Sequence, residues 1–361
     1  MNTSKTFLPL RDKIVALIYE NAFPKLKYLK TTEKDWKEIK TNLGIGQYTI
    51  HPSKSDVDSL TFTFSSPAIP PTTFCYKFSN QNLTEVSKLK LKNSNYYEYT
   101  TVKRLWAKSN DGTKIPITIL RSNAYSTKNS GLILKTYGAY GANTTPSFSA
   151  IDAVMMRQGY NIAYAHVRGE SILGPSWYKS GREFNKKNSI ADYLACAEHL
   201  IQEGITSSNK LIGYGNSAGG IVVAQTINEK PELFHTVILD HPYLDVINTM
   251  MNDSLPLTID EYKEWGNPQN KEVYDYIMGY SPYQNIQPNT YPNVLFLASY
   301  QDYRTPIWQI AKHVAKLRAN NLWNTKILFM TDMNSGHLGN RTGKEWIKAF
   351  AEKGSFMRLG R

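Results

Sequence analysis

Residues 211–220 read Leu-Ile-Gly-Tyr-Gly-Asn-Ser-Ala-Gly-Gly, a short apolar run that passes directly into a turn of small residues. The pattern Gly-x-Ser-x-Gly is typical of a nucleophile elbow, in which a serine occupies a strained turn between a strand and a helix. Gly215 and Gly219 have to lack side chains so that the strand and the helix can pass closely. Ser217 is therefore the candidate nucleophile, and the Ala218 N–H group is a candidate donor to an oxyanion formed beside it.

Apolar runs alternate with helical periodicity on both sides of this elbow. Helical stripes run over residues 190–202 and 308–317, and the expected strands are 132–136, 162–165, 211–214, 237–239, 294–298 and 327–330. Such alternation predicts an α/β domain with a mostly parallel sheet and helices on both faces. Earlier in the chain, residues 50–80 alternate apolar and polar side chains between turns, which predicts a small antiparallel β segment.

A serine nucleophile needs a base and an orienting acid, which follow it in the order Asp, His in the α/β-hydrolase arrangement. Asp302 comes just after the expected strand 294–298, and His337 lies in a glycine-flanked loop after the strand 327–330. The carboxyl ends of parallel strands are where open α/β sheets assemble their sites. The sequence therefore predicts a catalytic triad of Ser217, Asp302 and His337.

Other acids and histidines fit these roles less well. Asp240 and Asp245 also follow a strand, but they come only 23 and 28 residues after Ser217 and fit the wall of the site better. The remaining histidines belong to the N-terminal part or lie in or near expected elements, which favours packed or solvated imidazoles: His51, His166, His199, His235, His241 and His313.

The composition is that of a globular chain with enough length for two domains. It has 361 residues, 41% hydrophobic and 20% charged, and a mean hydropathy of -0.43. Cys75 and Cys196 match no metal or redox spacing, so we expect a reduced, cytoplasmic protein without a metal or cofactor. The apolar run 14–19 is too short and too polar in its flanks for a signal peptide or a membrane span.

The net charge of +12 is concentrated away from the elbow. Residues 1–130 hold 20 Lys and Arg against 10 Asp and Glu, whereas residues 131–361 hold 22 against 20. A basic segment with interleaved tyrosines at 88–103 has the composition to bind phosphates, but a solvated lysine-rich surface explains it equally well. Because no basic helix, zinc spacing or RNA-binding signature accompanies it, we expect no nucleic-acid partner.

Further stretches occur in a specific order along the chain: Lys135-Thr-Tyr-Gly-Ala-Tyr-Gly141, His166-Val-Arg-Gly-Glu170, the Ser217 elbow, Ser254-Leu-Pro-Leu-Thr258, Glu264-Trp-Gly-Asn-Pro268, Tyr280-Ser-Pro-Tyr283, Asp302-Tyr-Arg304 and Gly336-His337. With them, residues 102–356 resemble the catalytic domain of the prolyl oligopeptidase family of serine peptidases, and most closely its oligopeptidase B branch. The resemblance implies an α/β-hydrolase fold in which Ser217 is the nucleophile, His337 the base and Asp302 its orienter.

The resemblance also implies roles around the triad. It makes the Tyr140 hydroxyl the second oxyanion donor, Arg304 a contact to the substrate backbone, and Glu261 the carboxylate that holds an Arg or Lys side chain of the substrate. Tyr140 could equally be a packed aromatic, Arg304 could be salt-bridged to Asp302, and Glu264 is a rival to Glu261.

Departures from the family pattern qualify these roles. Asn216 stands where glycine is common, and asparagine tolerates unusual backbone angles. Lys263, Thr145 and Ser147 stand where the family has further acids, so we expect cleavage after single basic residues rather than a preference for pairs.

The largest departure is length, because family members carry a seven-bladed β-propeller in front of the catalytic domain. We expect residues 1–100 to be a truncated remnant that resembles the last blade, and residues 101–361 to be the catalytic domain. The predicted function is a serine oligopeptidase that cleaves short basic peptides through an acyl-enzyme on Ser217. The alternatives are a broad acyl hydrolase, or a remnant with little activity that needs another copy or a second chain supplying the missing blades.

Overall fold

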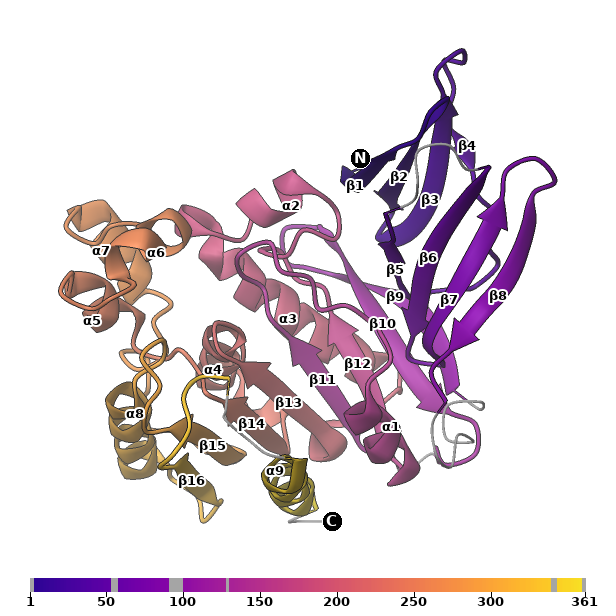
Figure 1. Ribbon diagram of the computed structural model, residues 1–361. Coiled ribbons are helices and arrows are strands. Elements are labelled where there is room, and N and C mark those ends of the chain that lie inside the picture. The colour runs from indigo at the N-terminus through magenta and orange to yellow at the C-terminus, as the bar shows by residue number, and fades with distance from the viewer. Residues whose placement is uncertain (1–2, 53–57, 91–99, 128–129, 339–342, 359–361) are drawn as a thin grey trace.

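The computed structural model describes residues 3–52, 58–90, 100–127, 130–338 and 343–358. Within these ranges the strands form three sheets, of which the largest carries the helices (Figure 1). Most of the basic, tyrosine-containing segment 88–103 falls on residues 91–99 and so lies outside the described residues.

The largest sheet is built from β9 (Thr100–Lys108), β10 (Lys114–Ser122), β11 (Leu132–Thr136), β12 (Asn161–Ala165), β13 (Leu211–Asn216), β14 (Thr236–Asp240), β15 (Asn293–Ser299) and β16 (Ile327–Asp332). The strands lie in the order β16-β15-β14-β13-β11-β12-β10-β9. The six strands from β11 to β16 all pair in parallel with their neighbours among them. Strand β10 runs antiparallel to both β12 and β9. The six strands expected from the sequence are β11 to β16, and their arrangement confirms the α/β-hydrolase fold. Strand β10 was not among the expected strands. It contains Pro116, which has no N–H group to donate to a neighbouring strand and so interrupts the strand pattern in the sequence.

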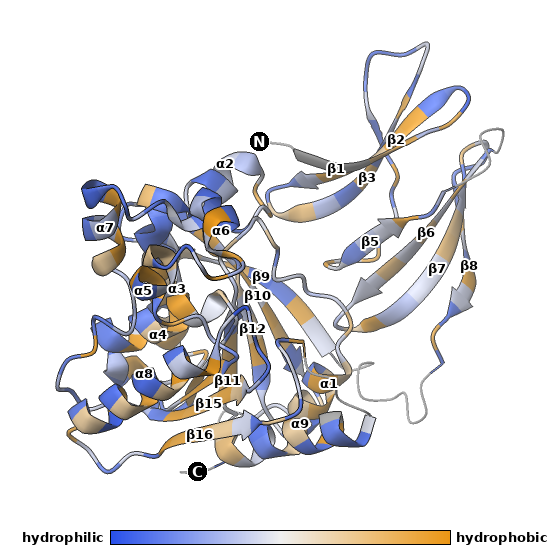
Figure 2. Cartoon of the chain, turned by 60° about the vertical axis from the view of Figure 1, so that its left-hand side comes forward, coloured by the Kyte–Doolittle hydropathy of each residue, from blue (hydrophilic) through white to orange (hydrophobic). Residues whose placement is uncertain are grey.

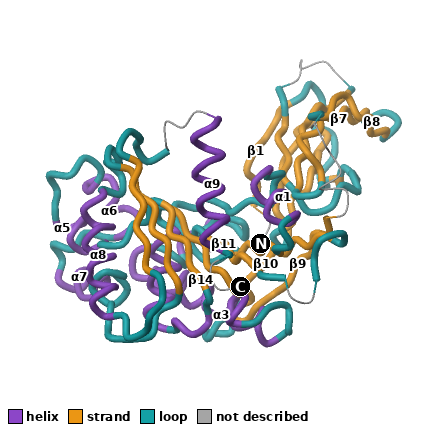
Figure 3. The backbone as a smooth tube through the Cα atoms, turned by 90° about the horizontal axis from the view of Figure 1, so that it is seen from below, coloured by secondary structure: helices purple, strands orange, loops and turns teal. Residues whose placement is uncertain are grey.

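Helices cover both faces of this sheet. One face carries α1 (Ala150–Arg157) and α9 (Gly343–Met357), and the other carries α3 (Lys186–Gln202), α4 (Gly219–Glu229) and α8 (Ile307–Asn320) (Figure 3). Neighbouring strand residues point to opposite faces, so Ile133 and Ile238 pack under α1 and α9, while Leu134 and Leu239 pack in the core that contains α3, α4 and α8. Burying each such side chain contributes about 1.5–3 kcal/mol, which makes β11 and β14 a rigid base for the loops that follow them.

Shorter helices lie between β12 and β13, between β13 and β14, and between β14 and β15. These are α2 (Pro175–Lys179), α5 (Val246–Met251), α6 (Thr258–Trp265) and α7 (Lys271–Met278), with 3-10 helices at Glu183–Asn185, Ser208–Lys210 and Pro231–Leu233. Trp265, Ile247 and Ile277 form one buried cluster with Ala218, so α5, α6 and α7 pack against the elbow. Among the helices of the described residues, none combines the length and the apolar character that crossing a bilayer requires.

Two four-stranded antiparallel sheets precede the α/β sheet. The first contains β1 (Thr3–Pro9), β2 (Lys13–Glu20), β3 (Phe23–Lys30) and β4 (Lys37–Glu38), and the second contains β5 (Gln47–Ile50), β6 (Ser59–Ser66), β7 (Ile69–Lys77) and β8 (Asn82–Lys88). Figure 2 shows both sheets set apart from the α/β sheet, whose strands β11 and β15 are largely hydrophobic. The sequence pattern predicts only the second sheet. In β3 the buried Leu26 and Tyr28 do alternate with Lys25 and Lys27, but the many lysines conceal this period.

Candidate active site

The elbow places Ser217 between the end of β13 and the start of α4. Its backbone adopts a φ of 49°, a left-handed conformation that is strained for serine. A Cβ atom on Gly215 would lie 2.6 Å from the Gly219 carbonyl oxygen, and one on Gly219 would lie 2.7 Å from the Thr136 oxygen. The Ser217 N–H group donates to the Asp240 carbonyl oxygen at 3.0 Å. The elbow therefore needs both glycines and is anchored to the neighbouring strand β14.

The structure brings Ser217, His337 and Asp302 together. Ser217 Oγ lies 3.0 Å from His337 Nε2, and His337 Nδ1 lies 2.7 Å from Asp302 Oδ2. Because an ionised carboxylate only accepts, Nδ1 donates to Asp302 and Nε2 is left to accept from the serine hydroxyl. Asp302 follows β15 and His337 follows β16, so neighbouring parallel strands deliver the acid and the base to one edge of the sheet.

Asp302 is buried and surrounded by donors. Its Oδ1 accepts from the Arg304 and Thr305 N–H groups at 2.9 and 3.0 Å, and its Oδ2 accepts from the Thr305 hydroxyl at 2.7 Å. Burial acts to raise the pKa of Asp302, but the hydrogen bonds from His337 and Thr305 outweigh it, and the pKa lies below its ordinary value. Thr305 was not among the residues expected from the sequence, although it stands three positions after Asp302.

Arg304 lies at the mouth of the site with an exposed side chain. Its contact with Asp302 runs through the backbone N–H group, and its guanidinium lies 6.0 Å from the centroid of the Tyr303 ring. Among the salt bridges of the described residues, none joins Arg304 to Asp302. The guanidinium is therefore available to the cavity that Arg304 helps to line.

A cavity of about 350 Å³ opens beside Ser217. Its apolar wall includes Met250, Leu255 and Leu257, and its polar wall includes Glu261 and Arg304. A cavity that is largely apolar with a few charged groups is typical of a site that binds one side chain of a substrate.

The two glutamates of α6 have different surroundings. Glu261 lines the cavity, where its Oε2 accepts from the Tyr140 hydroxyl at 2.7 Å and from Trp265 Nε1 at 2.8 Å. Burial raises the pKa of Glu261, and these hydrogen bonds partly offset the rise. Glu264 is buried and accepts instead from the Tyr140 N–H group at 2.9 Å and from the Tyr178 hydroxyl at 2.6 Å. Of the two, Glu261 is thus the one that faces the cavity.

The Tyr140 hydroxyl, which the resemblance makes an oxyanion donor, has a partner in the structure. That hydroxyl donates to Glu261, whereas the phenol of Tyr137, three residues earlier, lines the cavity together with Ser217. Burial raises the pKa of Tyr137, and the nearby Ser217 side chain partly offsets the rise. Both tyrosines line the cavity, so the motif in residues 135–141 lies at the site. Ala218 is buried just before the first turn of α4, where no intrahelical carbonyl accepts from its N–H group.

The three positions that depart from the family acids lie outside the cavity wall. Lys263 is exposed on α6. Thr145 and Ser147 lie in the loop before α1, where the Thr145 hydroxyl donates to the Asn143 carbonyl oxygen at 3.2 Å and the Ser147 N–H group donates to the Thr145 carbonyl oxygen at 2.9 Å.

Asp240 and Asp245, the alternatives to Asp302 as the acid of the triad, bind other partners. Asp240 accepts from His241 Nδ1 at 2.8 Å and from the Tyr214 hydroxyl at 3.0 Å, and it also binds Lys353. Asp245 accepts from the side chains of Asn248 and Gln284 and pairs with Lys312. Neither carboxylate binds His337.

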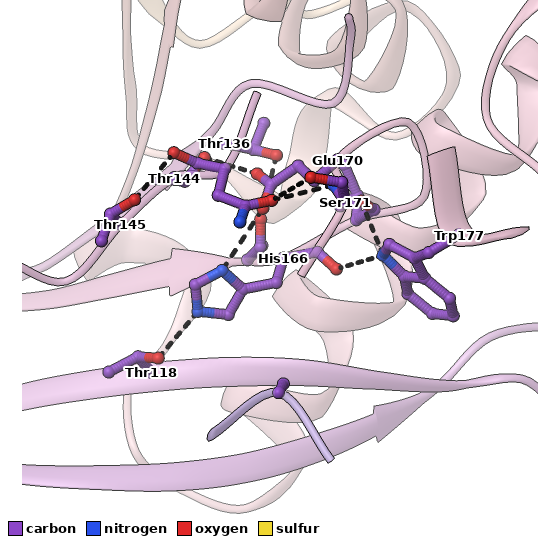
Figure 4. Close-up of polar contacts among 12 residues, drawn as sticks. Thr118, Thr136, Thr144, Thr145, His166, Glu170, Ser171 and Trp177 are labelled. Atoms are coloured by element: carbon purple, nitrogen blue, oxygen red, sulfur yellow. Dashed lines mark hydrogen bonds and ion pairs between the residues drawn. The ribbon is translucent and has the colours of Figure 1, made fainter. Parts of the chain in front are cut away.

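The other histidines are mostly packed, as Figure 4 shows for His166. It is fully buried, with Nε2 at 2.7 Å from the Thr118 hydroxyl and Nδ1 at 3.4 Å from Glu170. Burial and the nearby charge of Arg104 lower the pKa of His166 well below its ordinary value. His241 differs, because its ring lies 6.0 Å from the ring of His337.

Fold and site together define an α/β-hydrolase-fold protein with a Ser-His-Asp arrangement. Within the described residues, no three His, Cys, Asp or Glu side chains come together in a way that could hold a metal ion. A sequence model of the prolyl oligopeptidase family matches residues 146–358. The chain belongs to this family.

Relatives and solved structures agree with this assignment. The chain is 32% identical over 306 residues to dipeptidyl aminopeptidase BI of Pseudoxanthomonas mexicana, covering 84% of this chain and 42% of that protein. It is 31% identical to protease 2 of Moraxella lacunata, covering 97% of this chain and 51% of that protein. The structure of oligopeptidase B from Leishmania major aligns with a TM-score of 0.90 at 28% identity, covering 99% of this chain and 52% of that one. The chain thus spans about half the length of these relatives, or less.

Proposed function

We propose that this chain is the catalytic part of a serine peptidase that hydrolyses short peptides through an acyl-enzyme on Ser217. The observation that carries the proposal is the hydrogen-bonded series from Ser217 through His337 to Asp302 on a strained elbow. In the proposed reaction Ser217 Oγ attacks the peptide carbonyl carbon while His337 Nε2 accepts the hydroxyl proton. His337 then gives that proton to the leaving amine. Water next attacks the acyl-enzyme with His337 as the base, and the acid is released as the proton returns to Ser217.

We further propose that the oxyanion accepts hydrogen bonds from the Ala218 N–H group and the Tyr137 hydroxyl. The N-terminal end of α4 adds a positive potential at the same point. Both tyrosines line the cavity with Ser217, and the Tyr140 hydroxyl already donates to Glu261, which supports the choice of Tyr137.

Cleavage after Arg or Lys is the specificity that we propose. Glu261 supports it, because its carboxylate stands in the wall of the cavity beside the nucleophile, together with the apolar side chains of Met250 and Leu257. Tyr140 and Trp265 both donate to Oε2, and among the described residues none donates to Oε1, which leaves that oxygen for a cation of the substrate. We propose that Arg304, at the cavity mouth, binds a carbonyl of the substrate backbone.

A Glu261→Gln variant is expected to lose 1 to 3 kcal/mol with arginine substrates, or roughly 5-fold to 150-fold in kcat/KM, and to change little with phenylalanine substrates. A buried guanidinium loses its charged partner in this variant, whereas a neutral side chain does not. The measurement compares Gly-Arg, Arg-Arg and Gly-Phe amides.

Asp260→Asn is the matched control, since it removes the same charge from an exposed position of the same helix. Equal losses on Arg and Phe substrates would make Glu261 a structural residue. A strong preference for Arg-Arg over Gly-Arg would contradict the proposed single basic subsite.

A broad acyl hydrolase is the second candidate, because a triad with an oxyanion hole also cleaves esters. Comparing an arginine ester, an arginine amide and a lipid ester separates the two functions. A peptidase is expected to cleave both arginine compounds, and turnover of the lipid ester alone would favour the acyl hydrolase.

We also expect the 361-residue chain to associate, either with its own copies or with a second chain. Exposed apolar side chains stand close to the cavity wall, including Ile259 at 64% exposure, Tyr303 at 58% and Leu338 at 86%. Monomers rarely leave large contiguous apolar patches uncovered. Size-exclusion chromatography with light scattering measures the state, and a well-behaved monomer that cuts only short peptides would contradict the expectation.

A further inference from the structure

We propose that His241 is a positioning residue that holds the loop carrying His337 in place against the elbow. This inference rests on the proposed roles of Ser217 and His337. His241 directly follows β14, the strand between β13, which ends at the elbow, and β15, which leads to Asp302. It therefore stands where the segments that carry the three triad residues meet.

The side chain of His241 starts a buried series of hydrogen bonds that ends in the His337 loop. His241 Nε2 lies 2.7 Å from Ser299 Oγ, and Ser299 Oγ lies 2.7 Å from Ser335 Oγ. The two serines are almost fully buried, at 0% and 2% exposure, so water does not compete for these bonds. Ser335 precedes His337 by two residues, and its carbonyl oxygen accepts from the Gln301 N–H group at 3.1 Å.

Asp240, which binds the other nitrogen of the His241 ring, bears on which atom donates in each of these hydrogen bonds. Asp240 accepts from His241 Nδ1, and hydrogen bonds from His241 and Lys353 outweigh burial and hold the pKa of Asp240 below its ordinary value. When His241 donates from Nδ1 to Asp240, Nε2 can accept from the Ser299 hydroxyl, which can in turn accept from the Ser335 hydroxyl. The short distances along this series link the His241 ring to the loop that carries His337.

The backbone of the same two residues binds the other two parts of the triad. The Asp240 carbonyl oxygen accepts from the Ser217 N–H group at 3.0 Å, and the His241 carbonyl oxygen accepts from the Thr305 hydroxyl at 3.1 Å. The same hydroxyl, with its one proton shared between the two acceptors, also lies 2.7 Å from Asp302 Oδ2. Residues 240 and 241 are therefore bonded to the nucleophile, to the acid loop and, through the serines, to the base loop.

The backbone at His241 supports a role beyond packing. Its φ is 50°, a left-handed conformation that few side chains adopt without strain and that persists where the surrounding structure enforces it. An apolar side chain could fill the same space, but it would leave the hydroxyl of Ser299 without this partner.

The test replaces His241 by Asn, which tolerates the same backbone conformation but is too short to keep both ring contacts. We expect kcat for an arginine amide to fall about 10-fold to 100-fold with KM changed less than about 2-fold, because a small displacement of His337 affects the reaction and not substrate binding. Ser299→Ala removes the next bond of the series and is expected to cause a similar loss. The double variant should lose little more than either single one.

The matched control is His235→Asn, since His235 precedes β14 at the opposite end of the strand and contacts Thr236. It is expected to keep wild-type kcat. Full activity of His241→Asn would overturn the proposal, and so would a loss in His241→Asn that Ser299→Ala does not share.

A second measurement does not depend on catalysis. Amide hydrogen exchange of residues 335–337 is expected to be faster in His241→Asn and Ser299→Ala than in wild type, and unchanged in His235→Asn. If the wild type neither turns over substrate nor reacts with an organophosphonate, the proposed function fails while hydrogen exchange still decides the positioning role. Unchanged exchange in both variants would overturn that role.

Discussion

A Ser217→Ala variant is expected to lose turnover by a factor on the order of 10⁶, the loss seen when a member of a serine-protease triad is removed. Alanine has no nucleophilic oxygen, and His337 Nε2, which lies 3.0 Å from Ser217 Oγ, would then have no proton to accept. His337→Ala is expected to lose about as much. The double variant should lose hardly more, because the serine and the histidine act in one step.

The measurement is steady-state hydrolysis of an arginine amide together with labelling by a serine-reactive organophosphonate. Wild-type protein is expected to be labelled at Ser217, and Ser217→Ala is expected to remain unlabelled. Ser355→Ala is a suitable control, since this exposed serine on α9 donates to the Ala351 carbonyl oxygen of its own helix. Continued labelling of the Ser217→Ala protein would show that another residue is the nucleophile.

A Tyr137→Phe variant is expected to lower kcat roughly 10²-fold to 10³-fold while leaving KM nearly unchanged. The phenol of Tyr137 lines the cavity beside Ser217, so its hydroxyl is well placed to donate to an oxyanion that forms on the attacked carbonyl. Such a donor matters more in the transition state than in the bound substrate, and its loss therefore reduces turnover rather than binding.

Tyr140→Phe is the matched control, because it removes the same atom three residues away in the same loop. Its hydroxyl donates to Glu261, so the expected effect is a smaller loss confined mainly to arginine substrates. A larger loss of turnover in Tyr140→Phe than in Tyr137→Phe would return the oxyanion role to Tyr140, as the family resemblance alone implies.

The α/β sheet was predictable because its signal is local. Each strand from β11 to β16 is a short apolar run, and the runs are separated by segments with helical periodicity. Asp302 and His337 could be found for the same reason, since each follows such a run and parallel strands end at one edge of a sheet. The sheet of β1 to β4 was less visible, because lysines with half-buried side chains occupy the polar positions of β3.

What the sequence by itself determined is the family, the α/β fold and the loops that carry Ser217, Asp302 and His337. Only the tertiary structure decided which partner each of two similar side chains in one loop or helix takes. Tyr140 rather than Tyr137 binds Glu261, and Glu264 turns to the Tyr140 backbone, through bonds that span 121 and 124 residues of sequence. The contact of His241 with Ser299 also depends on the folded chain, because the two residues lie 58 positions apart in the sequence. Strand and helix periodicity depends on neighbours a few residues apart, whereas the direction of a side chain depends on partners that only the folded chain brings within hydrogen-bond distance.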